Sequence, residues 1–195
     1  MKQPLGVILA GGQATRMGGG DKGLLTLGGG TILSHVIERL EPQVADLALN
    51  ANGDIARFAD LGLPVISDSI SGFAGPLSGV LAGLDWAAEQ GADHIVTAAA
   101  DTPFFPCDLV AQLLLAAQTA GTNIALARTT GGRHPTFGLW PTALRDDLRS
   151  ALAGGLRKVV LWTDQHGAAT AHFPDDAAFF NVNTPNDLAT AQDML

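Results

Sequence analysis

The chain has 195 residues, of which 47% are hydrophobic and 15% charged, a composition that excludes a disordered or fibrous protein and fits a compact enzyme-like fold. Its net charge of −8, with only 11 lysines and arginines, argues against nucleic-acid binding, because such binding depends on many basic side chains set against phosphates. The first apolar run, 5–10, is too short for a signal peptide or a membrane span, so we expect a cytoplasmic protein without a membrane partner.

Short apolar runs alternate with helical patterns, which predicts strand–helix–strand units and a three-layer α/β fold with a mostly parallel sheet. Strands are expected, in chain order, at 5–9, 46–50, 64–67, 94–100 and 124–127. Apolar residues at helical spacing predict a helix over 32–40, a second with Pro76 in its first turn, and a third opened by Pro106. A lone cysteine permits neither a disulfide nor a cysteine-built zinc site, and we expect Cys107 to be a small buried thiol.

The last third of the chain is less regular. It predicts an extended segment over 134–140, helices near 143–152 and 156–162, and two short strands. Thr184, Pro185 and Asp187 predict one more helix start, with a capping residue, a first-turn proline and an acid at the third position. No linker or repeat divides the chain, so we expect one domain over 1–195.

The segment 7–22, VILAGGQATRMGGGDK, is the most informative part of the sequence. Glycines in it lack a Cβ atom, so the backbone can take positive φ and bring N–H donors close to an anion; they are Gly11, Gly12, Gly18, Gly19 and Gly20. With positive charge from Arg16 and Lys22, the expected ligand is a nucleoside triphosphate. The Walker pattern is excluded, because Lys22 follows Asp21 and precedes Gly23. A glycine-rich surface turn is the alternative.

Candidate site residues stand just past the predicted strands, at the edge where ligands collect in open parallel sheets. They are Leu9 to Gly12, Asn50, Asp68 and Asp101. Asp101 ends an apolar run and precedes Thr102 and Pro103, which should hold its carboxylate rigidly. One such carboxylate suits Mg²⁺, which commonly uses one or two carboxylates, keeps several waters and takes its other oxygens from substrate phosphates. Alternatively, Asp101 only caps the following turn.

Other polar residues at this edge are expected to serve the nucleotide. Asp68 is expected to contact it rather than to ligate metal, and Asn50 to face it unless, with Asn52, it only forms a turn. Lys22 is expected to stabilise the charge that grows on a departing pyrophosphate, with Arg16 in the same role. A solvated surface lysine is the alternative for Lys22.

The loop pattern LAGG-x-x-x-R-M-G-x-x-D-K resembles the nucleotidyltransferases that activate sugars and cofactors, and within them the molybdenum cofactor guanylyltransferases. Further matching motifs are NAN at 50–52, GPLSG at 75–79, ADTPF at 100–104, HPTF at 134–137 and FNVNTP at 180–185, so the resemblance covers nearly the whole chain. It implies a Rossmann-like fold, a requirement for GTP and Mg²⁺, and transfer of GMP to the terminal phosphate of a molybdenum-bound pterin.

The resemblance also implies roles for individual residues. Its nucleotide contacts carry over to Leu9, Ala10, Gly11, Lys22, Asn50, Asp68 and Asp101, with Asp101 also the metal ligand, and Gly12 of the same loop is placed with them. On the side expected to receive the pterin, family positions match His134, Pro135, Asn181 and Asn183, with Arg157 and Lys158 as candidate phosphate anchors. From the residues alone, a histidine before a proline, as His134 is, is more often a structural turn residue, and the alternative for the two asparagines is bonding to loop backbone.

The implied partners are GTP and molybdenum-molybdopterin, with molybdopterin-delivering proteins and target molybdoenzymes as further candidates. The N-terminal part would bind GTP and the C-terminal part the pterin. Thr31 departs from the pattern, since many similar nucleotidyltransferases carry a Lys or Arg there before a proline. Charge at the acceptor phosphate is therefore expected from another residue.

The expected reaction is in-line attack of the acceptor phosphate on the α-phosphorus, with no dedicated base because a phosphate monoester has a second pKa of about 6. One alternative is a cytidylyltransferase for the same pterin, although such relatives usually read LAAG and DQP where this chain has LAGG and DTP. Another is a sugar- or polyol-phosphate nucleotidyltransferase. A third is a non-catalytic module that binds GTP and hands the pterin to apoenzymes.

Overall fold

The computed structural model describes residues 2–11, 21–70 and 75–195. Its strands are β1 (Leu5–Leu9), β2 (Thr26–Leu27), β3 (Gly30–Thr31), β4 (Leu47–Asn50), β5 (Val65–Ile66), β6 (His94–Ala99), β7 (Ala125–Thr129), β8 (Gly132–Pro141) and β9 (Ala169–His172). Its α-helices are α1 (Ile32–Leu40), α2 (Pro76–Glu89), α3 (Leu109–Ala120), α4 (Arg145–Ala153), α5 (Val159–Gln165) and α6 (Pro185–Asp193). Short 3₁₀ helices span Lys22–Leu24, Glu41–Gln43, Ile55–Leu61, Thr142–Leu144 and Ala177–Phe179.

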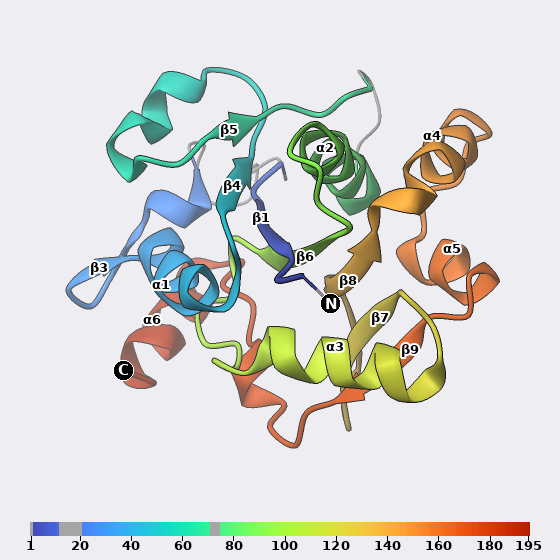
Figure 1. The fold of residues 1–195 in the computed structure, drawn as a ribbon. Helices are drawn as coiled ribbons and strands as arrows, with labels where there is room; N and C mark the ends of the chain where they lie inside the picture. Colours follow the sequence, from blue (N-terminus) through green and yellow to red (C-terminus); the bar gives the residue numbers. More distant parts are fainter. Residues whose placement is uncertain (1, 12–20, 71–74) are drawn as a thin grey trace.

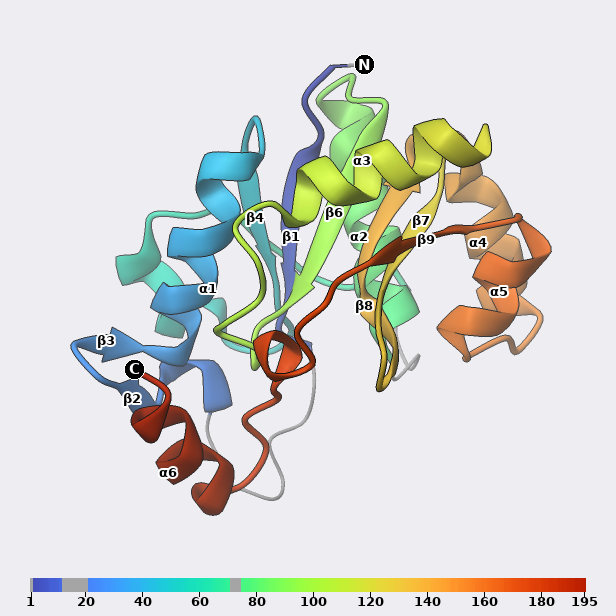
Figure 2. The ribbon, with the colours of Figure 1, turned by 90° about the horizontal axis from the view of Figure 1, so that it is seen from below.

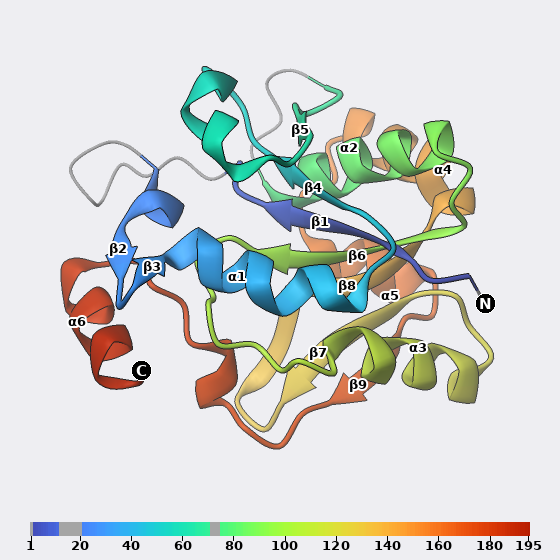
Figure 3. The same cartoon turned by 60° about the vertical axis from the view of Figure 1, so that its left-hand side comes forward.

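The main sheet of the described residues has seven strands in the order β5-β4-β1-β6-β8-β7-β9. Every neighbouring pair is parallel except those made by β8, which runs antiparallel to β6 and β7. β1, β4 and β6 therefore end at the same edge of the sheet (Figure 3), and so does β7. The prediction of an α/β fold with a mostly parallel sheet is confirmed.

Helices cover both faces of this sheet because successive strand residues point to opposite sides. On one face, α1 and α3 pack through residues such as Val36 and Leu113 into the cluster that contains Ile8. On the other face, α2, α4 and α5 pack into the cluster that contains Val7 and Trp162. The three layers are visible in Figure 1, with α1 and α3 on one side and α2, α4 and α5 on the other.

A smaller cluster joins the C-terminal segment to the β2–β3 hairpin and the start of α1. The C-terminal helix α6 lies beside the β2–β3 hairpin (Figure 2), where Leu27 and Ile32 pack with Val182 and Ala191. As predicted, α6 begins with a capping box, in which the Thr184 hydroxyl accepts from the Asp187 backbone N–H and the Asp187 side chain accepts in return. This contact brings the segment before α6 back to the start of the chain.

Three sequence predictions are wrong in detail. Helix α3 begins at Leu109 and not at Pro106, whose carbonyl accepts from the Leu109 N–H in the turn that precedes the helix. Cys107 lies in that turn and is exposed, because Leu109 and Val110 take the inward positions. Two short strands were expected near the end of the chain, but β9 is the one strand after α5 in the fully described stretch to the C-terminus.

No helix among the described residues combines the length and the apolar character needed to cross a membrane.

Candidate functional site

The candidate site lies at the edge where β1, β4, β5 and β6 end. Backbone hydrogen bonds continue the sheet by one residue beyond these strands: Ala10 N donates to Asn50 O at 2.8 Å, Ala51 N to Ile66 O at 3.0 Å and Ala100 N to Leu9 O at 3.1 Å. The side chains that follow each strand are therefore carried on rigid backbone, and the expected convergence of polar residues at this edge is present.

Lys22 is held between two elements that are distant in sequence. Its Nζ atom lies 3.1 Å from Oδ2 of Asp101 and donates to Oδ1 of Asn183 at 2.7 Å. The pair is partly screened from water, with exposed side-chain fractions of 20% for Lys22 and 25% for Asp101. One ammonium group thus joins the end of the glycine loop, the tip of β6 and the segment before α6.

Asp101 is anchored by its backbone as well as by Lys22. Its carbonyl accepts from the Val182 N–H at 2.8 Å, which ties the tip of β6 to the C-terminal segment. The Thr102 hydroxyl lies 3.3 Å from Oδ1 of Asp101 and also donates to the side-chain oxygen of Asn181. Asn181 and Asn183 therefore flank Asp101, one through Thr102 and the other through Lys22.

The Asn183 backbone is itself held by the cap of α6. Asp187 accepts from the N–H groups of Asn183 and Thr184 at 2.9 and 2.8 Å. The Asn183 N–H contributes most to the lowered pKa of Asp187, since it stabilises the ionised form. The helix start predicted from the sequence therefore also positions a site residue.

A second polar group forms beyond β4 and β5. Asn50 donates to Oδ1 of Asp68 at 3.0 Å, and Asn52 donates to Oδ2 of the same carboxylate at 3.0 Å. The Asn52 side-chain oxygen accepts the Asp68 N–H at 3.0 Å, so the two residues are bound in both directions. At Gly79 of α2, a Cβ atom would lie 2.3 Å from Oδ1 of Asn50, which explains why this helix carries glycine at that position.

Arg57 connects this group to the glycine loop. It forms an ion pair with Asp21, the residue before Lys22, and donates to the Asn52 carbonyl at 2.9 Å. Its guanidinium also lies 4.4 Å from the centre of the Phe58 ring. Sequence reasoning missed Arg57, because a single arginine in a 3₁₀ helix carries no motif of its own.

His134 lies on β8, farther along the same edge. Its Nε2 atom lies 2.8 Å from the Thr129 hydroxyl, and its ring stacks on Phe179 with centroids 4.2 Å apart. Burial lowers the pKa of His134, and the nearby Asp176 charge opposes part of that shift. His134 is thereby linked to Phe179, which stands two residues before Asn181.

The remaining predicted residues are placed as follows. Gly12 and Arg16 fall outside the described residues. Arg157 donates to the carbonyls of Leu152 and Leu156, in the connection between α4 and α5, and Lys158 is the N-cap of α5. Thr31, where many similar nucleotidyltransferases carry a Lys or Arg, caps α1 through its hydroxyl.

Comparison with known proteins gives consistent results. The family model of the MobA-like NTP transferase domain matches residues 6–169. A molybdenum cofactor guanylyltransferase of Cereibacter sphaeroides (strain ATCC 17029 / ATH 2.4.9) is 55% identical over 190 residues, which cover 97% of this chain and 96% of the relative. A protein of the same name from Bradyrhizobium sp. (strain ORS 278) is 52% identical over 192 residues, which cover 96% of this chain and 91% of the relative.

Solved structures share the fold at low sequence identity. The molybdopterin-guanine dinucleotide biosynthesis protein A from Archaeoglobus fulgidus has a TM-score of 0.73 at 22% identity, over 97% of both chains. The 4-diphosphocytidyl-2C-methyl-D-erythritol synthase from Anaerococcus prevotii has a TM-score of 0.77 at 12% identity, over 99% of this chain and 98% of that one. At such low sequence identities, these two structural similarities establish the fold alone.

Proposed function

Because the chain belongs to the MobA-like NTP transferase family, and within it to the molybdenum cofactor guanylyltransferases, we propose that it transfers GMP from GTP to the phosphate of molybdenum-molybdopterin and releases pyrophosphate. The N-terminal part of the chain binds the nucleotide and the C-terminal part receives the pterin. The observation that most supports this assignment is the position of Lys22, between Asp101 on the nucleotide side and Asn183 on the acceptor side.

Lys22 acts on the phosphates in this proposal. A nucleoside triphosphate laid over the end of β1 brings its phosphates to the ammonium group, which then stabilises the negative charge that grows on the leaving pyrophosphate. The hydrogen bond to Asn183 holds the ammonium in place before the substrate arrives, so little reorganisation is required during the reaction.

The donors at this edge fit a Mg²⁺ ion. Asp101 presents one partly exposed carboxylate at the tip of a strand, and the described residues contain no cluster of three or more acids, histidines or cysteines that could form a cage. Mg²⁺ needs only one or two carboxylates when phosphates and water complete its octahedron. We propose that Asp101 holds the ion, which would neutralise charge on the phosphates when bound.

The bond changes are those of an in-line displacement. An oxygen of the acceptor phosphate forms a bond to the α-phosphorus of GTP, and the bond from that phosphorus to the bridging oxygen of pyrophosphate breaks. A phosphate monoester is largely a dianion at neutral pH, since its second pKa is about 6, and it needs no protein base. We assign the Asn50–Asp68–Asn52 group to contacts with the nucleoside.

The experiment that tests this proposal is pyrophosphate release from GTP, CTP and ATP, each with Mg²⁺ and molybdenum-loaded pterin, beside a control without acceptor. Acceptor-dependent release with GTP and not with CTP or ATP is expected. Release with CTP would instead identify a cytidylyltransferase. Tight GTP binding without release in the presence of acceptor would identify a carrier module.

A further inference from the structure

Three basic side chains form a row across neighbouring strands at the far end of the sheet. Arg128 of β7 is in register with His172 of the parallel strand β9 and with Arg133 of the antiparallel strand β8. Residues in register on adjacent strands project from the same face. This basic row stands out in a chain that carries only 11 lysines and arginines against a net charge of −8.

The charges in the basic row are unevenly compensated. Arg133 forms an ion pair with Asp164 of α5 at 2.7 Å. Arg128 is exposed, and within the described part of the chain its guanidinium has neither a hydrogen bond nor an ion pair. Arg128 therefore carries the uncompensated charge of the row, directly opposite the like charge of Arg133, and a bound anion would relieve that repulsion.

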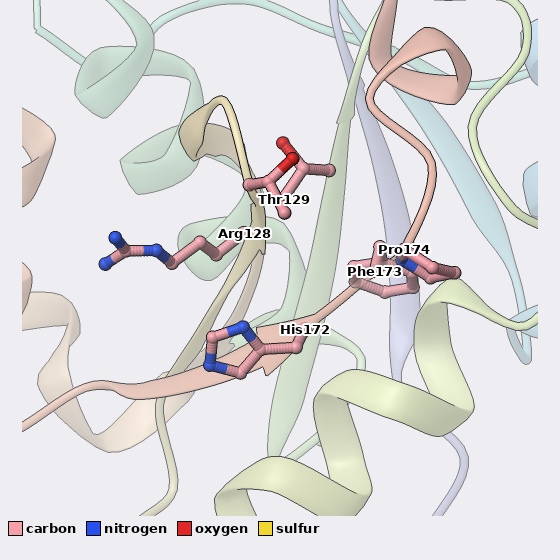
Figure 4. A pocket seen from close by; sticks show the side chains of 6 residues that line it. Arg128, Thr129, His172, Phe173 and Pro174 are labelled. Carbon is pink, nitrogen blue, oxygen red and sulfur yellow. The ribbon is translucent and has the colours of Figure 1, made fainter.

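A hollow of about 510 Å³ lies beside the basic row, a size that fits a small organic ligand. It is lined by Arg128, Thr129, Thr130, His172, Phe173 and Pro174. Arg128 and His172 extend to the same side of their strands, whereas Phe173 and Pro174 lie on the other (Figure 4). The ligand would therefore meet positive charge at one rim and apolar surface at the opposite one.

The two threonines of the hollow are already engaged. Thr130 donates to Asp176 at 2.6 Å, and Thr129 pairs with His134. The donors left for a ligand are the guanidinium of Arg128, which suits a bidentate oxyanion, and the imidazole of His172. Asp176 is a negative group near the hairpin turn, but three hydrogen-bond donors from residues 129–131 surround it and stabilise its charge there.

The hollow lies at the same edge of the sheet as the candidate active site, since β6 and β7 both run antiparallel to β8 and end at that edge. From Asp101 the contacts run through Thr102 to Asn181, and from Phe179, two residues earlier, through His134 to Thr129 in the wall of the hollow. With strands about 4.8 Å apart, β7 and β9 lie roughly 10 and 14 Å from β6 along the edge. An organic molecule whose phosphate reacts beside Asp101 can therefore extend over β8 to reach Arg128.

We propose that this hollow binds a second anionic group of the acceptor, an oxyanion remote from the reacting phosphate, through Arg128 and His172. The inference rests on the proposed function, since it takes the acceptor to be phosphate-bearing and to occupy this edge. A free inorganic oxyanion would satisfy the same donors, and the experiment below separates the two sources.

The test compares the wild type with Arg128→Gln. Arg145→Gln is the charge-matched control, because it removes the same charge from a partly exposed arginine that pairs with Asp146 and Asp85, away from the hollow. Sodium sulfate is titrated at constant ionic strength while the imidazole signal of His172 is followed by NMR, with His172→Gln as the assignment standard. The KM values for acceptor and for GTP are then measured in the transfer assay.

We expect the KM for acceptor to rise about tenfold or more in Arg128→Gln, as for the loss of a charge-assisted hydrogen bond, with the KM for GTP within about twofold of the wild type. The sulfate-dependent shift of His172 should disappear in this variant alone. An unchanged KM for acceptor overturns the proposal, and saturable sulfate binding beside it identifies a site for a free oxyanion. If the wild type transfers no GMP, the proposed function is wrong. The assignment of the hollow to the acceptor is then wrong as well, whether or not sulfate shifts the His172 signal.

Discussion

The Nζ atom of Lys22 donates to the side-chain oxygen of Asn183 at 2.7 Å, across 161 positions of sequence. The same ammonium lies 3.1 Å from Asp101, so a residue predicted on the acceptor side holds the cation predicted to serve the nucleotide. One side chain therefore connects the residues predicted to bind the two substrates. A change at Asn183 should alter the affinity for the nucleotide.

A double-mutant cycle of Lys22→Met and Asn183→Ala measures this coupling. We expect Asn183→Ala to weaken GTP binding in the absence of acceptor by roughly 1 kcal/mol, because the ammonium loses a hydrogen bond that fixes its position. In the Lys22→Met background, the Asn183 change should have almost no further effect. Calorimetry measures the free energy of GTP binding in each variant. If Asn183→Ala weakens GTP binding equally with and without Lys22, Asn183 acts independently of Lys22.

Asp101→Asn should lower kcat by about 10²–10³-fold with little change in melting temperature. The substitution keeps the side-chain shape and the backbone bond from Val182 but removes the charge. Asp108→Asn, at the exposed N-cap of α3, removes the same charge elsewhere and should leave kcat unchanged. Substantial turnover by Asp101→Asn would exclude a required carboxylate at the tip of β6.

Gly79→Ala should lower the free energy of unfolding by about 1–3 kcal/mol and raise the KM for GTP. The new Cβ atom would lie 2.3 Å from Oδ1 of Asn50 and 2.8 Å from the Leu9 side chain, so both must move. At Gly29, no atom lies within 4 Å of an added Cβ, and Gly29→Ala is the matched control. Chemical denaturation and GTP kinetics test the pair; equal stability of both variants would show that Asn50 shifts freely.

Asp176 should stabilise the β7–β8 turn in a pH-dependent way. Hydrogen bonds from the Thr129 hydroxyl, the Thr130 hydroxyl and the Gly131 N–H lower its pKa from 3.8 to about 2. The folded pKa is depressed, so the stabilisation is present above pH 4 and is lost as the pH falls from 4 to 2. We expect Asp176→Asn to be less stable than the wild type at pH 6 and the difference to shrink towards pH 2. Asp60→Asn, which removes the same charge from an exposed acid, is the matched control.

His94 should make the fold less stable in weak acid. Its ring is buried at the start of β6, and neither ring nitrogen has a partner among the described residues. Burial lowers its pKa from 6.5, with the Asp93 charge acting against that shift. A depressed histidine pKa means that stability is full above pH 6.5 and falls as the pH drops below it, because unfolding then takes up a proton.

His94→Phe should therefore be more stable than the wild type by about 1 kcal/mol at pH 7, since two unpaired buried polar atoms are removed, and the advantage should grow from pH 6.5 to pH 5. Urea denaturation at several pH values measures both effects. The exposed His172→Gln variant should keep the wild-type slope. A variant less stable than the wild type at every pH would show that the histidine ring is satisfied.

The sequence by itself determined the order and kind of most elements. Apolar periodicity, the glycine loop and the cap of α6 depend only on residues close together in the chain. It also determined which residues stand at the ends of parallel strands. Tertiary structure alone decided that β8 runs antiparallel, that Cys107 is exposed, and that Lys22 lies between Asp101 and Asn183. The reason is physical: these features depend on contacts between segments far apart in the chain, whose packing no local pattern encodes.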